Sequence, residues 1–186
     1  LLKFQRPFRV YMRWLSGRGA GREGIYVAGA NDGRFIVAEA EGLARFVTAR
    51  LDPADPRIFE RSRHPVTDVG IGRLLEMVGA NARRAAREGV LRVADRGRGA
   101  VDGRPVRQFE GILPRDPAAG YYGYRVVLSW DEGHGLPVRA ITYDWQDRLV
   151  EDYTYLELRL NANLTDRDFD PANPAYAFSR WRLRLP

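Results

Sequence analysis

The sequence contains no cysteine, and this absence excludes a disulfide framework, a thiol nucleophile and any cysteine-ligated metal or iron–sulfur site. Histidine is scarce as well: His64 and His134 are the only two, and neither stands at the spacing of a metal-binding motif. No stretch approaches the roughly 18 consecutive apolar residues that a membrane-spanning helix needs, so the sequence predicts no such helix. Lysine occurs once, at Lys3, among 30 basic residues.

The charge of the chain is positive but is not concentrated in one place. The formal net charge is +6, which by itself suits a nucleic-acid-binding protein. The arginines, however, are scattered among aspartates and glutamates, and no basic helix or aromatic RNA-binding motif accompanies them. We therefore predict no nucleic-acid partner.

Motifs of nucleotide-binding and hydrolytic proteins occur only in part. Residues 19–24 spell GxGxxG, but the stretch that follows predicts a strand and not the helix that a dinucleotide site requires. We interpret them as a flexible hairpin loop. Ser62, His64 and Asp68 lie close in sequence but no nucleophile elbow accompanies them, which favours polar residues at a helix entrance.

Acidic residues give no clear site either. Asp166, Asp168 and Asp170 match the first three ligands of a calcium loop, but the following glycine and the distal glutamate are missing, so we expect a capped turn. Further carboxylates are candidates for an acid–base pair: Glu23, Glu110, Asp131 and Glu151. Nothing in the sequence brings two of them together. We therefore predict no enzymatic activity, no metal site and no cofactor.

The segment from Tyr121 to Asn161 carries the clearest structural signal. Its first run has apolar residues at every second position: Tyr122, Tyr124, Val126, Leu128 and Trp130. Turn-like residues 131–135 and 146–147 separate it from a second run over 136–145 and a third over 148–160. Such runs joined by short turns predict an antiparallel meander.

Other strands and one helix are predicted in the rest of the chain. Strands are expected over 8–14, 23–29, 34–39, 43–51, 91–94 and 106–113. Residues 31–33 (Asn-Asp-Gly) predict a hairpin turn, since these residue types accept a positive φ. The helix is expected to begin at an N-cap on Thr67 and to end before Gly89. Its apolar stripe consists of Ile71, Leu74, Leu75, Val78, Ala82 and Ala85. A face of the sheet is the available surface to cover that stripe.

Length and composition complete the prediction of the fold. A chain of 186 residues with 45% hydrophobic residues suits one globular domain, which we place over residues 1–186. The chain opens without methionine, and residues 1–5 already resemble the end of a strand, so we expect further residues before them. The predicted fold class is mainly β within α+β, with an antiparallel sheet and one principal helix.

The apolar surface is the remaining candidate for function. A curved sheet with one helix has more apolar residues than that helix covers, which favours a ligand cleft between sheet and helix. The proposed lining residues are Met12, Trp14, Val27, Leu74, Val78, Tyr124, Trp130, Tyr143, Tyr153 and Tyr155. For each residue taken singly, ordinary core packing is the more common role.

Short motifs spaced along nearly the whole chain occur together in a fixed order. They are residues 6–14 (RPFRVYMRW), 21–23 with 25–27 (GRE, IYV), 29–33 (GANDG), 51–53 (LDP), 63–71 (RHPVTDVGI), 136–139 (LPVR), 153–155 (YTY), 161 with 164–166 and 168–170 (N, LTD, DFD), and 173–178 (NPAYAF). With these motifs the chain resembles a bacterial domain family of unknown function in the LolA-like, or lipoprotein-localisation-factor, superfamily.

The resemblance implies a strongly curved antiparallel sheet, an incomplete β-barrel, whose concave face is covered by helices. Members of the superfamily carry lipoproteins or other lipids across the periplasm, with acyl chains held between sheet and helices. The resemblance also implies a helix and a strand before Leu1, and an exported protein of the periplasm or cell envelope. None of the carriers' functional positions is matched to a residue of this chain.

The leading interpretation is a non-enzymatic envelope protein that binds a lipid, an acyl chain or a lipoprotein in the cleft between sheet and helix. An envelope protein is a further candidate partner. The alternative is an envelope scaffold or protein-interaction module with a filled core and no ligand. A hydrolase acting through His64 or a carboxylate pair would require those groups to converge in a cleft.

Overall fold

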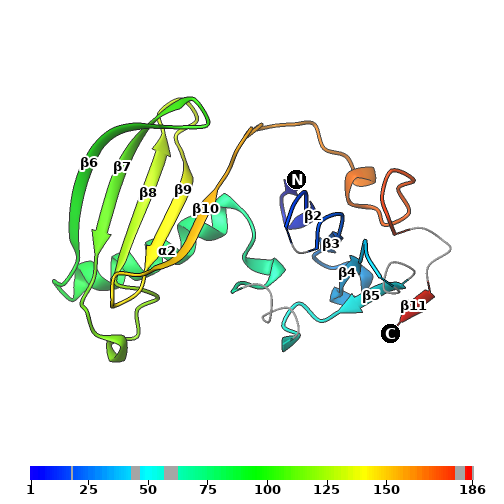
Figure 1. The fold of residues 1–186 in the computed structure, drawn as a ribbon, viewed down its shortest axis with the longest axis horizontal. Helices are drawn as coiled ribbons and strands as arrows, with labels where there is room; N and C mark the ends of the chain where they lie inside the picture. Colours follow the sequence, from blue (N-terminus) through cyan, green and yellow to red (C-terminus); the bar gives the residue numbers. More distant parts are fainter. Residues whose placement is uncertain (18, 43–46, 57–62, 179–182, 186) are drawn as a thin grey trace. The chain divides into compact units, whose positions relative to one another are not determined.

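The computed structural model describes residues 1–17, 19–42, 47–56, 63–178 and 183–185. The chain forms two compact units. Unit 1 comprises Leu1–Val69 together with Asn161–Pro186, and unit 2 is the continuous segment Gly70–Leu160. Each unit has its own sheet (Figure 1). A single domain over residues 1–186 stays a prediction.

The sheet of unit 1 has six strands in the order β1-β2-β3-β4-β5-β11. They are β1 (Leu2–Gln5), β2 (Arg9–Arg13), β3 (Glu23–Val27), β4 (Phe35–Ala38), β5 (Val47–Leu51) and β11 (Leu183–Leu185). The first five pair antiparallel, each with its neighbour in sequence, and β11 joins β5 in parallel. The expected strands over 8–14, 23–29 and 34–39 are confirmed, whereas residues 43–46 of the expected strand over 43–51 lie outside the described residues.

The turns of unit 1 follow the sequence-based expectation. The short 3₁₀ turn η1 (Asn31–Gly33) joins β3 to β4, and all three of its residues have positive φ, which confirms the predicted hairpin turn. The glycine-rich loop before Glu23 leads directly into β3, so the GxGxxG letters belong to a strand-to-strand connection. At Gly24 a Cβ atom would lie 2.5 Å from Cζ of Phe35, so this position requires glycine.

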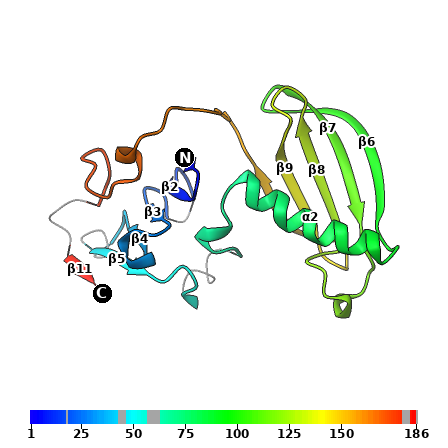
Figure 2. The ribbon, with the colours of Figure 1, turned by 180° about the vertical axis from the view of Figure 1, so that it is seen from behind.

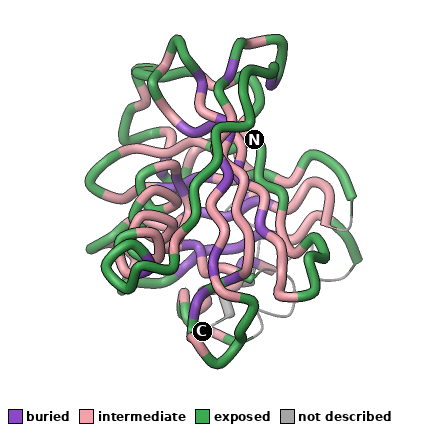
Figure 3. The backbone as a smooth tube through the Cα atoms, turned by 90° about the vertical axis from the view of Figure 1, so that its left-hand side faces the viewer, coloured by how far each residue is buried: buried purple, intermediate pink, exposed green. Residues whose placement is uncertain are grey.

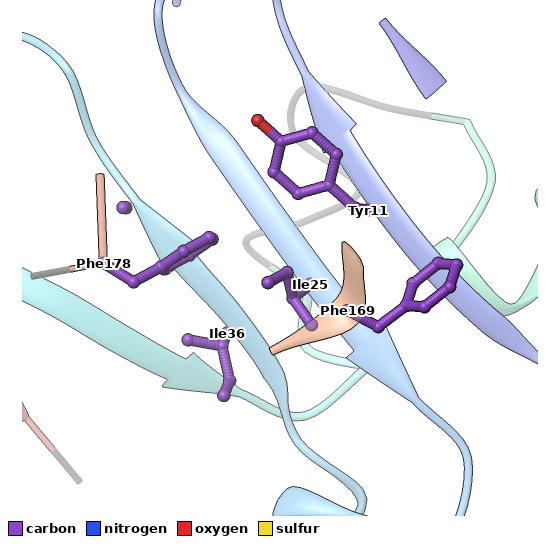
Figure 4. Packing of buried hydrophobic residues seen from close by; sticks show 6 residues of the cluster. Tyr11, Ile25, Ile36, Phe169 and Phe178 are labelled. Carbon is purple, nitrogen blue, oxygen red and sulfur yellow. The ribbon is translucent and has the colours of Figure 1, made fainter. Parts of the chain in front are cut away.

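Both faces of the unit 1 sheet carry apolar clusters. On one face Tyr11, Ile25, Ile36 and Ala38 pack with Phe169 and Phe178 of residues 161–178, here called the tail segment. Figure 4 shows the rings of Phe169 and Phe178 lying over these strand residues. The tail segment contains the 3₁₀ helix η5 (Asp166–Phe169). On the other face Val10, Phe35 and Val37 pack with Val66 of the 3₁₀ helix η3 (Val66–Asp68).

Unit 2 contains a five-stranded antiparallel sheet in the order β10-β9-β8-β7-β6. Its strands are β6 (Arg92–Val101), β7 (Arg104–Ile112), β8 (Arg125–Asp131), β9 (Leu136–Tyr143) and β10 (Leu149–Thr154), with the 3₁₀ helix η4 (Pro117–Ala119) between β7 and β8. The predicted meander is therefore confirmed, with two differences. β6 extends from Arg92 to Val101 where we expected residues 91–94, and the third run of the meander stays a strand only to Thr154.

The helix α2 (Ile71–Arg87) crosses one face of this sheet, as Figure 2 shows from behind. Gly70 is its N-cap, with φ 114°, so the expected N-cap at Thr67 is wrong. Thr67 instead belongs to η3, which ends at Asp68. Gly70, with its positive φ, separates η3 from the helix. Gly89 has φ 70° just after the helix, as expected for its C′ residue.

The predicted fold class is confirmed: the protein is mainly β, with open, curved antiparallel sheets and one principal helix (Figures 1 and 2). The strands that we expected to form one sheet are divided between two. Hydrophobic alternation shows which residues face a core, but it does not show which strands share that core.

Candidate functional site

Unit 2 presents an apolar row that crosses four strands of its sheet. The register aligns Phe109 of β7 with Leu128 of β8, Ala140 of β9 and Tyr153 of β10. Because side chains alternate between faces along a strand, Val126 and Trp130 share the face of Leu128. We call this side of the sheet the apolar face.

Helix α2 lies against the apolar face. Its Ala85 is fully buried and packs with Leu113 and Tyr121, while Leu91, just after the helix, packs on the same cluster. A Cβ atom at Gly111 would lie 3.9 Å from Leu91, and Gly111 is paired with Val126, which fixes the face that the helix covers.

The helix covers only part of the apolar face. Val93 on β6 and Tyr153 on β10 keep 66% and 45% of their surface exposed. Phe109, Leu128 and Trp130 are half-buried. The apolar face therefore retains exposed apolar side chains on both edge strands. The register also places the ion pair of Asp95 and Arg107 on this face, beside Phe109 and Trp130.

Five of the ten predicted lining residues belong to this arrangement. Leu74 and Val78 share the helical stripe of Ala85 and are half-buried. Tyr124, whose carbonyl accepts a bond from the Leu113 amide at 2.8 Å, precedes Val126 by two residues and so continues the same face. Trp130 and Tyr153 complete the group: all five belong to the helix or to the face that it covers.

Tyr143 is on the opposite, charged face of the sheet. There Glu110, only 6% exposed, accepts hydrogen bonds from Arg96 at 2.8 Å and Arg125 at 3.2 Å. Arg125 also donates to Asp147 at 2.8 Å, and its guanidinium lies 3.6 Å from the centroid of the Tyr143 ring. Tyr143 therefore belongs to an ion-pair network and not to an apolar lining.

Tyr155 follows the end of β10. Its amide donates to the carbonyl of Val138 at 2.8 Å, its side chain is half-buried, and burial raises the pKa of its hydroxyl. It therefore lies beside β9, beyond the last residue of β10.

The three remaining predicted residues are in unit 1, on two different faces of its sheet. Met12 and Trp14 pack on the cluster of Val10, whereas Val27 packs on the cluster that the tail segment covers. The structure thus does not bring the ten residues into one lining. A lining made of the five residues on α2 and the apolar face stays a proposal.

The sequence analysis missed a set of polar contacts, here called the polar clamp, that holds the tail segment to the sheet of unit 1. Lys3 donates to Oδ1 of Asp168 at 2.7 Å and to the hydroxyl of Tyr176 at 3.0 Å. The Tyr176 ring stacks on Tyr11, with centroids 4.1 Å apart. Glu23, 3% exposed, accepts a bond from the Ala177 amide at 2.8 Å. The only signal for this clamp in the sequence was the single lysine.

The clamp shifts the ionisation of two of its residues. The hydrogen bond from Lys3, together with bonds from Thr165, lowers the pKa of Asp168 to about 2. Burial, followed by the nearby Glu23 carboxylate, raises the pKa of Tyr11 to about 12. Asp168 also caps η5, because Thr165 and Asp168 form a reciprocal capping box. The expected capped turn is therefore confirmed.

A shallow groove of about 400 Å³ lies at the edge of the tail segment within unit 1. Val27, Phe169 and Pro171 form its apolar part, and an ion pair between Arg9 and Asp166 lies at its rim. Its lining comes entirely from the β3–β4 turn, the edges of β2 and β3, and the tail segment. Val27 is the one predicted lining residue that contributes to it.

Of the candidate catalytic groups, the structure brings His64 and Asp68 together. Nδ1 of His64 lies 3.6 Å from Asp68, while Ser62 is outside the described residues. Asp131 is fully buried, and the hydrogen bond from Arg104 keeps the pKa of its carboxyl well below the usual range. Across the residues that the structure describes, no group of three or more His, Asp or Glu side chains is arranged to hold a metal ion. In the same part of the chain, no helix has the length and apolarity to cross a membrane.

Comparison with known proteins identifies a family. Residues 2–178 match the family model described as "Protein of unknown function (DUF1571)". The predicted membership of a domain family of unknown function is therefore confirmed. No match was found among curated proteins.

Solved structures are similar to this chain at low sequence identity. The chain is 19% identical to MucB in its crystal structure, with a TM-score of 0.51, and the match covers 91% of this chain and 49% of MucB. The complex of MucA and MucB from Pseudomonas aeruginosa matches with 17% identity, a TM-score of 0.41, and coverage of 91% and 52%. A putative outer membrane lipoprotein-sorting protein domain from Vibrio parahaemolyticus matches with 14% identity, a TM-score of 0.37, and coverage of 87% and 69%.

The chain thus spans about half the length of MucB. At 19% identity the match with MucB shows a shared fold and does not by itself transfer an activity.

Proposed function

This chain belongs to the DUF1571 family of proteins of unknown function, and we propose that it is a cell-envelope binding protein that holds an acyl chain of a lipid or lipoprotein on the apolar face of unit 2. The observation that carries the proposal is the incomplete cover of that face. Exposed apolar side chains remain on both edge strands of that face, at Val93 on β6 and Tyr153 on β10.

The physical driving force suits an acyl chain. Each methylene that leaves water contributes about 0.8 kcal/mol, so a chain of moderate length binds well without specific polar contacts. The exposed Arg115, whose guanidinium lies 4.3 Å from the ring centroid of Tyr124, supplies a positive charge on this side for an anionic headgroup. The resemblance to lipoprotein carriers supports the same class of ligand and the periplasm or cell envelope as its location.

A second candidate function is an envelope scaffold or protein-interaction module without a ligand. It is favoured by unit 1, where Phe169 and Phe178 of the tail segment fill the face on which Val27 lies. This candidate and the first differ in whether the purified protein contains lipid.

The first experiment is native mass spectrometry of the purified protein, followed by organic extraction and lipid analysis. A co-purifying lipid in near-stoichiometric amount supports the carrier or sensor function. A protein that is empty and also fails to bind a fluorescent fatty acid contradicts it and favours the scaffold.

Paired variants locate the binding surface. Val93→Gln with Tyr153→Gln adds polar groups at both edges of the apolar face, where each side chain is exposed and tolerant of change. We expect the dissociation constant for a dansyl-labelled fatty acid to rise about tenfold, or about 1.4 kcal/mol.

The matched control places the same residue type on the other face. Ala94→Gln with Thr154→Gln uses exposed neighbours on the same two strands, whose side chains point away from α2. We expect affinity within about twofold of the unmodified chain. Equal losses in both double variants would place the fatty acid elsewhere.

A further inference from the structure

The outer edge of β6 is open in the part of the chain that the structure describes. β6 has 10 residues and ends the strand order of its sheet, with β7 as its partner. Residues 92–100 are all exposed. Figure 3 colours the chain by burial, viewed from the side on which β6 lies in Figure 1. A strand at a sheet edge has backbone donors and acceptors that a further strand can pair with.

The register identifies which backbone groups of β6 point outward. Ala100 is paired with Pro105, which has no N–H, and the Pro105 carbonyl accepts a bond from Glu132 on the side of β8. Ala100 and Pro105 are therefore not hydrogen-bonded to each other, so the N–H and C=O of Ala100 point to the open edge. Arg98, two residues earlier in an uninterrupted register, presents its backbone groups on the same side.

The pairing of β6 with β7 has a continuous register around Arg98 and Ala100. A bulge interrupts the register between Asp95 and Gly97, and bulges commonly protect sheet edges from pairing. From Gly97 to Val101 the register with β7 is continuous. Past the bulge, which includes the positive φ of Gly97, the second half of β6 offers a segment in continuous register for pairing.

The charge of β6 selects the partner. Between Arg92 and Val101 the strand has three arginines and one aspartate, a formal charge of +2. Asp95 is paired with Arg107 and Arg96 with Glu110, while the side chain of Arg98 is 81% exposed even though it contacts Glu132 at 3.2 Å. Carboxylates on an added strand would lie beside these arginines as favourable cross-strand pairs.

We propose that the edge of β6 from Gly97 to Val101 binds an extended acidic segment of another protein by β-strand addition. Main-chain hydrogen bonds to Arg98 and Ala100 supply the affinity, and the exposed side chain of Arg98 favours acidic sequences. A second copy of this chain is disfavoured as the occupant, because pairing β6 with itself brings together two strands of charge +2. The inference does not depend on the proposed binding of an acyl chain.

The test is fluorescence anisotropy of the full chain with a labelled peptide of about the length of β6 that alternates glutamate with valine and threonine. Two control peptides share its pattern: one has lysine in place of glutamate, and one is N-methylated at alternate amides. We expect saturable binding of the acidic peptide and at least about tenfold weaker binding of both controls. Equal binding of the N-methylated peptide, or no binding of the acidic peptide up to about 1 mM, overturns the proposal.

Two substitutions at Ala100 test whether the acidic peptide binds at the edge of β6. Ala100→Pro removes an outward N–H and leaves the bonds to β7 intact, so we expect about tenfold weaker binding of the acidic peptide. Ala100→Val keeps the N–H and is the matched control, with affinity within about twofold. Unchanged binding by Ala100→Pro would exclude this edge.

Hydrogen exchange provides a measurement on the unmodified chain. We expect the amides of Arg98 and Ala100 to exchange fast in the free protein and to become protected when the acidic peptide is bound. Peptide binding without protection of these amides overturns the proposal. So does a dimer in sedimentation equilibrium that Ala100→Pro dissociates, since the occupant is then a second copy.

Discussion

At the scale of single residues, Lys3 and Asp168 join the two ends of the sequence of unit 1. Lys3 contacts both Asp168 and Tyr176, and its ammonium lies 5.4 Å from the ring centroids of Tyr11 and Tyr176. Asp168 has a second role as the N3 residue of the capping box of η5, whose N-cap is Thr165. A change at Asp168 therefore affects both η5 and the attachment of the tail segment to the sheet, whereas a change at Lys3 affects the attachment.

Asp168→Asn is expected to change the acid stability of the protein. The pKa of Asp168 is lowered to about 2, so its ionisation stabilises the fold above about pH 4, and this contribution is lost as the pH falls toward 2. The variant should be less stable at neutral pH and should lose less stability on acidification. Urea unfolding at a series of pH values between about 7 and 2 measures both effects.

Asp166→Asn is the control for this change, because Asp166 pairs with Arg9 but its side chain is 91% exposed. We expect its effect on the free energy of unfolding to stay below about 1 kcal/mol. The role assigned to Asp168 is wrong if both variants show the same pH dependence.

Tyr11→Phe is expected to act at the alkaline end. Burial raises the pKa of the Tyr11 hydroxyl to about 12. The protonated hydroxyl therefore stabilises the fold below about pH 10, and this contribution is lost as the pH rises toward 12. The variant should lose less stability across that range than the unmodified protein. Chemical unfolding followed by circular dichroism measures the difference, and identical alkaline slopes would contradict it.

At the scale of elements, the contact between α2 and the sheet depends on one small residue. Ala85 is fully buried against Leu113 and Tyr121, so a larger side chain has no room there. Tyr121 further ties this end of the helix to the sheet through its hydrogen bond to Glu88.

Ala85→Leu is expected to destabilise unit 2 by about 1–3 kcal/mol, because added methylenes force neighbouring side chains out of place. Ala86→Leu, one position along on an exposed part of the helix, is expected to stay within about 0.5 kcal/mol. Thermal and chemical unfolding compare the two. Equal stability of both variants would show that the helix does not pack as described.

The strands and the helix also show which features of the fold a sequence pattern predicts. The meander, its turns and the helix were predicted, because alternation, positive-φ residues and the 3.6-residue period are local signals. The full length of β6 was not, since an edge strand exposed from Arg92 to Ala100 has no buried face to produce alternation. The third run of the meander was predicted too long: its apolar pattern continues past Thr154, but the strand stops there, and Glu157, three residues later, has a positive φ of 50°.

The site was predictable only in part for a related reason. Leu74, Val78, Tyr124, Trp130 and Tyr153 follow periodic patterns, and the structure assigns them to the helix and to the face that it covers. Tyr143 fits the same pattern as well as they do, but the register aligns it with Arg125 on the charged face. Contacts such as that between Lys3 and Asp168 span 165 residues of sequence, and no local pattern reports them.

At the scale of the whole molecule, the division into two units raises the question whether the protein unfolds in one cooperative transition. We predicted one domain over residues 1–186, and a single domain unfolds in one transition. Phe169→Ala leaves a cavity in unit 1, where Phe169 is 4% exposed, and should cost about 3–5 kcal/mol. Ala85→Leu acts in unit 2.

If the chain is one domain, both substitutions lower the same thermal transition, as seen by calorimetry. Two transitions, each shifted by only one of the substitutions, would contradict the prediction of a single domain. The ratio of calorimetric to van't Hoff enthalpy gives an independent check on the unmodified protein.

The discontinuity of unit 1 has a consequence for the order of events during synthesis. Unit 2 is one unbroken segment, and each of its strands pairs with the next, so its contacts form within a short stretch of emerging chain. The sheet of unit 1 keeps one apolar face uncovered until residues 161–178 are made, long after β1 to β5. Strands β1 to β5 are therefore made before unit 2 but completed only after it, and during that interval a chaperone would find exposed apolar surface on Ile25 and Ile36.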